Sequence, residues 1–340
     1  MTGRLRTYAP GKVNLCLLVG EPRADGYHPL ASVFQAVDLA DELTLEPAPA
    51  GATADEVVCA GVEGPNLADR ALAAYREASG WDGPPVRITI VKRVPVAAGM
   101  GGGSGDAAAA LRLAAHAAGR PDDPLIARIA PTLGADVPFA LHGGRALVTG
   151  IGEHVEALPP GPPAALVVVP APTALSTPAV YREADRLAGV GGPNRADGGP
   201  DRADGGPDRP DGASARDEHG TGRSTPAAGP VEAGLRSAVL LAAAEQGLRD
   251  RLAMGGAPPA VNDLEPAALS LDPGIRRALD DLAAAGAQTP IVSGSGPTTF
   301  GRFEDPEEAE AVARRLEAAH PGTVVARPAP AGLTAVTVLP

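Results

Sequence analysis

A glycine-rich segment between a predicted strand and a predicted helix constrains the fold of this chain more than any other feature. The segment Pro95–Ala110 holds five glycines between positions 99 and 105. The β-branched run Val86–Val91 before it is typical of a strand, and apolar residues at helical spacing follow it. The first N–H groups of a helix lack intrahelical partners and lie at the positive end of its dipole. The segment therefore predicts a phosphate-binding loop.

The glycine segment matches neither of two common nucleotide motifs. No Gly-Lys-Ser/Thr follows it, and counting Gly-x-Gly-x-x-Gly from Gly99 places Ser104 at the last position. A flexible linker in a glycine-rich protein is the alternative interpretation. The loop alone leaves both open, so other parts of the chain have to distinguish them.

Composition and length exclude several classes of protein. A chain of 340 residues is long enough for two domains, and with 44% hydrophobic but only 3% aromatic residues its cores must be largely aliphatic. A formal net charge of −12 argues against nucleic-acid or anionic-membrane binding. Two cysteines are too few for a disulfide framework, and no signal peptide or apolar run of about 20 residues is present. We expect a soluble, cytoplasmic protein.

The two lysines of the chain, Lys12 and Lys92, stand out among 29 basic residues. Because the other basic residues are arginine, a lysine here suggests a need for a compact ammonium group. Chance retention on the surface is the alternative. Lys12 and Asn14 alternate with apolar residues in Ala9–Val19, which predicts a strand after a Pro-Gly turn. Their shared face is either a site or the wet face of an edge strand.

Further strands and two polar candidates follow along the first half. We expect a separate strand at Arg4–Tyr8, and two more at Ala31–Val37 and Glu42–Leu45. Tyr27 and His28 lie in a polar loop that is either a surface turn or a base-stacking platform. Asp136, flanked by small and apolar residues, is either a helix cap or a functional acid.

The second half contains an unusual insertion and a second glycine loop. Residues 189–230 are rich in Gly, Pro, Asp and Arg and have almost no apolar side chain to bury, which predicts disorder. The run Thr289–Phe300 places a glycine loop between two short strands. Strands and helices mixed throughout predict two α+β domains, 1–160 and 161–340, with the insertion in the second.

Three motifs taken together resemble those of the GHMP kinase superfamily. They are Pro-Gly-Lys-x-Asn near the start, Pro-x-x-x-Gly-x-Gly-Gly-Gly-Ser in the middle and Ser-Gly-Ser-Gly-Pro near the end. Four further stretches are similar to those of the 4-diphosphocytidyl-2-C-methyl-D-erythritol kinases: Ala24–Leu30, Gly101–Gly103, Gly134–Pro138 and Asn262-Asp263. The resemblance covers nearly the whole chain except the insertion.

The resemblance implies a fold and an activity. The fold is a ribosomal protein S5 domain 2-like N-terminal domain followed by a ferredoxin-like C-terminal domain. The activity is ATP- and Mg²⁺-dependent phosphorylation of the 2-hydroxyl of a small substrate, cytidine diphosphate-linked methylerythritol, in the non-mevalonate route to isoprenoid precursors. Another GHMP kinase, such as a homoserine kinase, and a catalytically silent ligand-binding member are the alternatives.

The resemblance also implies roles for individual residues. Asp136 is the catalytic base and Lys12 stabilises charge on the reacting oxygens. Asn14, Tyr27, His28, Gly294, Ser295 and Gly296 bind the substrate. The ATP loop comprises Pro95, Val96, Ala97, Ala98, Gly99, Met100, Gly101, Gly102, Gly103, Ser104 and Gly105, with Ser104 the one candidate Mg²⁺ ligand.

Two positions of the ATP loop depart from the family pattern. Met100 replaces the usual leucine, an exchange of similar volume. Gly105 replaces the usual second serine, which puts any role of that hydroxyl in doubt. Asp106 follows at the start of the helix, and we expect it to point away from the phosphates, which it would otherwise repel.

Overall fold

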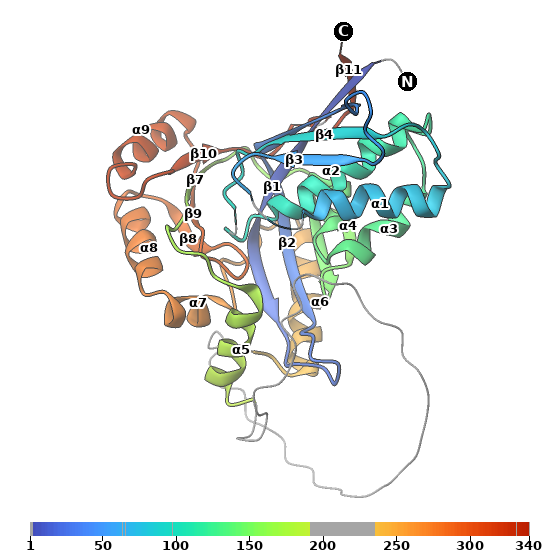
Figure 1. Cartoon of the computed structure of the whole chain (residues 1–340). Helices are drawn as coiled ribbons and strands as arrows, with labels where there is room; N and C mark the ends of the chain where they lie inside the picture. Colours follow the sequence, from blue (N-terminus) through green and yellow to red (C-terminus); the bar gives the residue numbers. More distant parts are fainter. Residues whose placement is uncertain are drawn as a thin grey trace, which may run out of the picture.

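The computed structural model describes residues 3–62, 64, 66–96, 98–190, 235–330 and 332–339. In these ranges the chain forms two β-sheets with helices packed on them, as Figure 1 shows, which confirms the predicted α+β class. Ala97 of the ATP loop and positions 191–230 of the predicted insertion, with its expected disorder, lie outside the described residues. In the described part of the chain, no helix is both long and apolar enough to cross a membrane.

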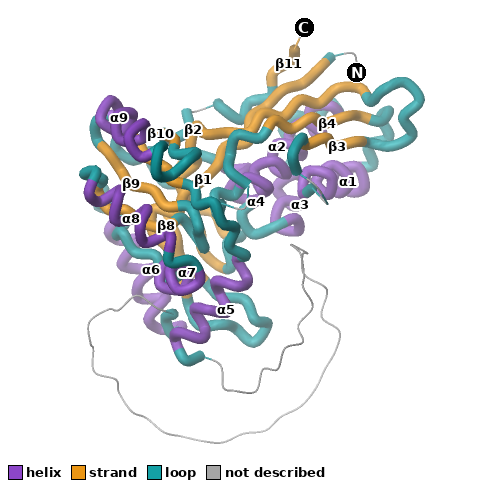
Figure 2. Tube along the Cα trace, turned by 60° about the vertical axis from the view of Figure 1, so that its left-hand side comes forward, coloured by secondary structure: helices purple, strands orange, loops and turns teal. Residues whose placement is uncertain are grey.

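The first sheet has the strand order β11-β1-β2-β4-β3, with β5 on β2 and β6 on β5. Helices α1, α2 and α4 pack on it, α3 packs on these helices, and the small side chains of α2 fill the core between them. Strand β11 pairs with the start of β1, so the end of the described chain returns to the first sheet (Figures 1 and 2). The strands are β1 Arg4–Val19, β2 Leu30–Pro47, β3 Glu56–Cys59, β4 Val86–Val91, β5 Arg145–Gly150, β6 His154–Ala157 and β11 Thr337–Leu339; the helices are α1 Leu67–Ser79, α2 Gly102–Ala117, α3 Leu125–Leu133 and α4 Val137–His142.

The predicted division of the first two strands was wrong. Arg4–Val19 is one strand rather than two joined by a Pro-Gly turn, and Leu30–Pro47 is likewise continuous. The register of β1 against β2 shifts between Pro10 and Lys12, so the regular pairing is interrupted there. An interrupted ladder accommodates a proline, which has no N–H donor, and the strand continues through the dipeptide.

The second sheet has the antiparallel order β10-β7-β9-β8. Helices α8 and α9 pack on one face, and the other face packs on the first sheet through a shared apolar core. This sheet and its helices occupy the side of the molecule opposite α1 and α3 in Figure 1. The elements are β7 Ala165–Val169, β8 Gln288–Val292, β9 Thr299–Phe303, β10 Val324–Ala326, α8 Gly274–Ala284 and α9 Pro306–Leu316, with α5 Thr177–Ala188, α6 Ala238–Ala253 and α7 Glu265–Leu271 beside them. The domain boundary at 160/161 stays a prediction.

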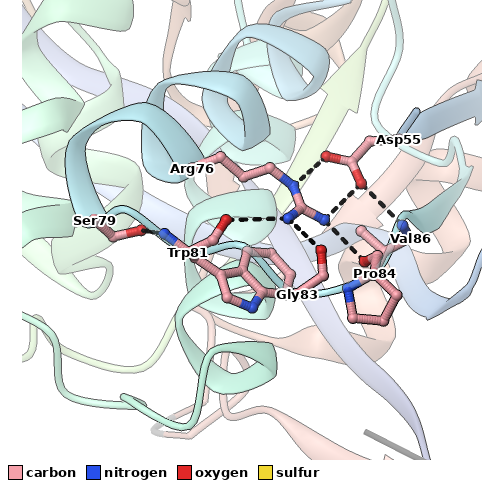
Figure 3. A network of polar contacts seen from close by, with 7 residues as sticks. All are labelled: Asp55, Arg76, Ser79, Trp81, Gly83, Pro84 and Val86. Carbon is pink, nitrogen blue, oxygen red and sulfur yellow. Dashed lines mark hydrogen bonds and ion pairs between the residues drawn. The ribbon is translucent and has the colours of Figure 1, made fainter. Parts of the chain in front are cut away.

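A polar network fixes the connection that leads into β4, the strand before the ATP loop (Figure 3). Arg76, at the end of α1, donates two hydrogen bonds to Asp55 at 2.5 and 2.8 Å. It donates three more to the backbone carbonyls of Trp81, Gly83 and Pro84. Since a guanidinium has five N–H donors, this one is saturated. The network holds the entry to β4, and through it the position of the loop.

Candidate active site

A cavity of about 520 Å³ lies where the ATP loop faces elements of both halves of the chain. The lining includes residues from β1, β2, α2, α5 and the second glycine loop, and it collects most of the site residues expected from the sequence. These are Lys12, Asn14, Pro95, Val96, Ala98, Gly99, Met100, Gly101, Gly102, Gly103, Ser104, Asp136, Gly294 and Ser295.

Lys12 presents its ammonium group to this cavity from β1. The Nζ atom donates to Asn14 Oδ1 at 2.7 Å and lies 4.8 Å from the centre of the Phe34 ring. Asn14 in turn donates to the Ser32 hydroxyl at 3.0 Å. The shared face of Lys12 and Asn14 is therefore a buried, hydrogen-bonded surface and not the wet face of an edge strand.

Asp136 faces Lys12 from the residue before helix α4. Its Oδ2 atom lies 3.6 Å from Lys12 Nζ, and the two side chains are 31% and 9% exposed. Asp136 occupies the N-cap position, but its side chain makes no capping hydrogen bond. A carboxylate that does not cap its own helix and faces both an ammonium group and a cavity is placed to act on a ligand.

The two glycine loops meet without side chains between them. A Cβ atom on Gly99 would lie 2.7 Å from the carbonyl oxygen of Gly296, closer than real contacts allow. A Cβ on Gly294 would lie 3.1 Å from Asn14 Oδ1. Asn262 donates to the carbonyls of Val292 and Gly294, both at 2.8 Å, and so holds the second loop. Glycine is needed at Gly99 because the two backbones approach so closely, and it is favoured at Gly294 by a left-handed φ of 60° beside the Asn14 side chain.

Helix α2 begins within the ATP loop and points its first turn at the cavity. Gly101 is the N-cap, has φ of 67° and makes no side-chain capping bond, so the N–H groups of the first turn are open to a ligand. Ser104 lines the cavity in this turn. Gly105 is buried instead, and a Cβ there would lie 3.2 Å from the Pro10 carbonyl oxygen. A residue at this position therefore faces β1 and not the cavity.

Lys92 and Asp106 form a buried charge cluster at the edge of the cavity. Lys92 Nζ lies 2.5 Å from Asp41 Oδ2 and 2.9 Å from Asp106 Oδ2. Burial raises the pKa of Asp106 to about 7, although the charge of Lys92 opposes the shift. Lys92 is thus held in an ion-pair cluster rather than retained by chance on the surface. Asp106 lines the cavity, and its Oδ1 atom is buried without a hydrogen-bond partner.

The structure places Tyr27 and His28 differently from the rest of the expected site. Tyr27 is 50% exposed in its loop, and neither residue lines the cavity. His28 is buried, donates a hydrogen bond from Nε2 to Asp185 Oδ1 at 2.9 Å, and contacts the Tyr181 ring with centroids 4.8 Å apart. Tyr181 does line the cavity, and burial and the nearby charge of Asp136 raise its pKa. His28 therefore adjoins the cavity through Tyr181.

The cavity wall includes residues that the sequence did not single out, and three of them offer a hydroxyl group or an aromatic ring to a ligand. Thr177 and Tyr181 reach the site from α5, where Thr177 Oγ1 lies 3.0 Å from Ser295 Oγ. Phe34 reaches it from β2. No local motif marks them. For Phe34 and Tyr181 the available signal was the scarcity of aromatic residues. The whole chain has four tyrosines and four phenylalanines, so each of them is a candidate for ligand binding.

The described residues offer little for a metal ion of their own. Among them, no group of three or more His, Cys, Asp or Glu side chains is arranged to hold one. Ser104, in the open first turn of α2, supplies a hydroxyl oxygen beside the expected position of phosphate. That donor set fits Mg²⁺ held mainly by phosphate oxygens and water.

Comparison with known proteins agrees with the site. The models of the GHMP kinase N-terminal and C-terminal domains match residues 66–144 and 241–322. A 4-diphosphocytidyl-2-C-methyl-D-erythritol kinase of Streptomyces avermitilis is 40% identical, covering 97% of this chain and 98% of its own. One of Mycobacterium tuberculosis is also 40% identical, covering 87% and 81%. The fold and site define a GHMP kinase. Within that class, the chain belongs to the family of 4-diphosphocytidyl-2-C-methyl-D-erythritol kinases.

Solved structures support the same family. A crystal structure of 4-(cytidine 5'-diphospho)-2C-methyl-D-erythritol kinase superposes with a TM-score of 0.66 and 34% identity, covering 95% of this chain and 98% of the other. A homoserine kinase from Cytophaga hutchinsonii superposes with a TM-score of 0.60 at 16% identity, covering 100% and 98%. The second likeness shows the shared fold alone.

Proposed function

We propose that this protein transfers the γ-phosphoryl group of ATP to the 2-hydroxyl of 4-diphosphocytidyl-2-C-methyl-D-erythritol, in the non-mevalonate route to isoprenoid precursors. The observation that carries the proposal is the Lys12–Asp136 pair, 3.6 Å apart beside an open helix N-terminus, in a chain of this kinase family. The proposal includes that the protein is located in the cytoplasm, where ATP is available.

Asp136 takes the proton of the 2-hydroxyl as its oxygen bonds to the γ-phosphorus. The bond from that phosphorus to the β–γ bridging oxygen breaks, and ADP leaves. The ammonium of Lys12, held by Asn14, stabilises negative charge on the reacting oxygens. Bound Mg²⁺ would neutralise phosphate charge, and Ser104 is the residue proposed to hold it.

The nucleotide phosphates lie on the first turn of α2, cradled by the ATP loop, and Gly294 and Ser295 close the site from the second half. Tyr27, His28 and Gly296 are proposed as substrate contacts, as is Tyr181, which is in ring contact with His28 and faces the cavity. The cytosine base requires such flat faces and polar edges.

The test is a coupled assay of ADP release from Mg·ATP with the cytidyl diphosphate substrate, beside homoserine and mevalonate. We expect turnover with the first alone, and loss of about 10²- to 10⁴-fold in kcat for Asp136→Asn, the usual contribution of a positioned base. Turnover of homoserine alone would refute the substrate. No ADP from any of the three would favour a catalytically silent protein.

A further inference from the structure

A second cavity, of about 380 Å³, lies on the other side of β1 from the active site. Leu15 lines it, whereas the neighbouring Asn14 lines the catalytic cavity, as expected for adjacent strand residues that point to opposite faces. Among the described residues, none lines both cavities. Apolar side chains form much of its wall, including Leu15, Leu158, Leu166, Leu252, Ile291 and Phe300.

Two arginines, Arg145 and Arg302, are the only charged side chains among the described residues that line this cavity. Arg145 begins β5 in the first sheet and Arg302 lies in β9 of the second, so each half of the chain supplies one. Burial lowers the pKa of Arg145, and the positive charge of Arg302 lowers it further. Two like charges from opposite sheets therefore line the same cavity.

Neither guanidinium has an ion-pair partner among the described residues, and the Nε atom of Arg145 is buried without any hydrogen bond. This differs from Arg76, whose five donors are all used. Arg302 is two residues from Phe300, so the two share the face of β9 that packs toward the first sheet. A partly buried, unpaired charge on an interior face carries a desolvation cost that nothing in the described chain offsets.

We propose that this cavity binds an organic phosphate monoester with a compact apolar body. Its dianionic phosphate would lie between Arg145 and Arg302, because guanidinium groups match phosphate oxygens in geometry and two of them balance its two charges. The apolar body would pack against the leucines and Phe300. A ligand with only a charged group would leave the apolar wall without contacts, and a ligand with only an apolar body would leave the two arginines unpaired. The cavity therefore favours a ligand that has both parts.

Isothermal titration calorimetry with hexyl phosphate tests the proposal on the full-length wild-type protein, beside inorganic phosphate and 1-hexanol. We expect saturable binding of hexyl phosphate, and binding at least about tenfold weaker for the other two, a difference of about 1.4 kcal/mol. Equal binding of inorganic phosphate, or no binding of hexyl phosphate, overturns the proposal.

Single-residue variants show whether hexyl phosphate binds in this cavity. Arg145→Gln and Arg302→Gln should each weaken hexyl phosphate binding at least about tenfold without lowering thermal stability, because each removes an unpaired partly buried charge. Arg87→Gln is the matched control and should bind as wild type, because Arg87 is a partly exposed arginine of β4 that is paired with Glu56 of β3 and lies outside this cavity. A fall in affinity with Lys12→Gln but not with the two arginine variants would place the ligand in the catalytic cavity and overturn the proposal.

Discussion

Arg76 and Lys12 are two cations held in hydrogen-bonded surroundings, and they differ in how many of their donors the protein uses. Arg76 donates hydrogen bonds from its guanidinium N–H groups to Asp55 and to three backbone carbonyl oxygens, which uses all five donors, as Figure 3 shows. The ammonium group of Lys12 has three N–H donors, and one of them is used in the hydrogen bond to Asn14. The nearest carboxylate oxygen, Asp136 Oδ2, lies 3.6 Å from Lys12 Nζ. A saturated cation stabilises the fold, whereas an unsaturated one beside a cavity has donors left for a ligand.

The largest expected effect is that of Lys12→Gln on turnover. Removing a donor that stabilises charge in the transition state lowers kcat by about 10²- to 10³-fold. Thermal stability should change little, because the amide can still hydrogen bond to Asn14. Steady-state kinetics and a thermal melt on the same sample measure both. A melt that collapses while the remaining folded protein turns over normally would make Lys12 a structural cation like Arg76.

The opposite outcome is expected for Arg76→Gln. The change leaves the Asp55 carboxylate without its ion pair and frees carbonyls of the β4 connection, which costs about 3 kcal/mol, at the low end for a broken buried pair. We take the low end of the range because the side chains of Arg76 and Asp55 are still 21% and 19% exposed. Urea unfolding measures the loss, and kcat of the folded protein should stay within about twofold of wild type. A large fall in kcat at unchanged stability would contradict the comparison.

Gly101→Ala tests the position of Lys12 without changing its charge. The new Cβ would lie 3.1 Å from Lys12 Cγ, so the ammonium must shift, and we expect kcat to fall about tenfold since catalysis depends on such alignment. The positive φ of 67° adds a strain cost of about 1 kcal/mol. Gly119→Ala is the control: it has φ of 73° with nothing within 4 Å, so it should share the strain and keep the turnover. Equal kcat values for the two variants would refute the positional argument.

The last comparison concerns Asp106, which shares the ammonium group of Lys92 with Asp41 at the cavity edge. The pKa of Asp106 is raised to about 7 by burial, against an unfolded value of about 4, so the folded state binds more protons between these values. The free energy of unfolding should therefore fall as the pH rises from about 4 to about 7. Asp106→Asn should flatten this part of the profile in urea titrations. An identical slope in the variant would show that Asp106 does not titrate there.

The sequence was most informative where chemistry is local. The ATP loop, the strand before it and helix α2 were predicted because glycine spacing and β-branched or alanine-rich runs reflect the backbone directly. Lys12 and Asp136 were singled out by residue type and by resemblance, and the structure brings them together. Pro10 was misinterpreted because a Pro-Gly dipeptide is the same local signal whether the chain turns or a strand continues through an irregular pairing. Asp106 was expected to point away from the site, yet it lines the cavity edge, neutralised by Lys92.

Other parts of the site depend on tertiary packing, which local patterns do not report. Tyr181 lies 45 positions beyond Asp136 in the chain and reaches the cavity only because α5 packs beside it. Arg145 and Arg302 face one cavity only because β5 and β9 belong to sheets that pack together. Tyr27 was grouped with the site, together with His28, by its flat ring and by the resemblance, although its side chain is half exposed.

The contact between Gly99 and Gly296 has a consequence for how such an enzyme can change over evolutionary time. Because main chain meets main chain there, any side chain at position 99 would have to push the second glycine loop away from the ATP loop. This stretch of the cavity wall is therefore set by the backbone. Helix α5 touches the same cavity through side chains alone, so a new substrate preference can arise there by single exchanges at Thr177 or Tyr181.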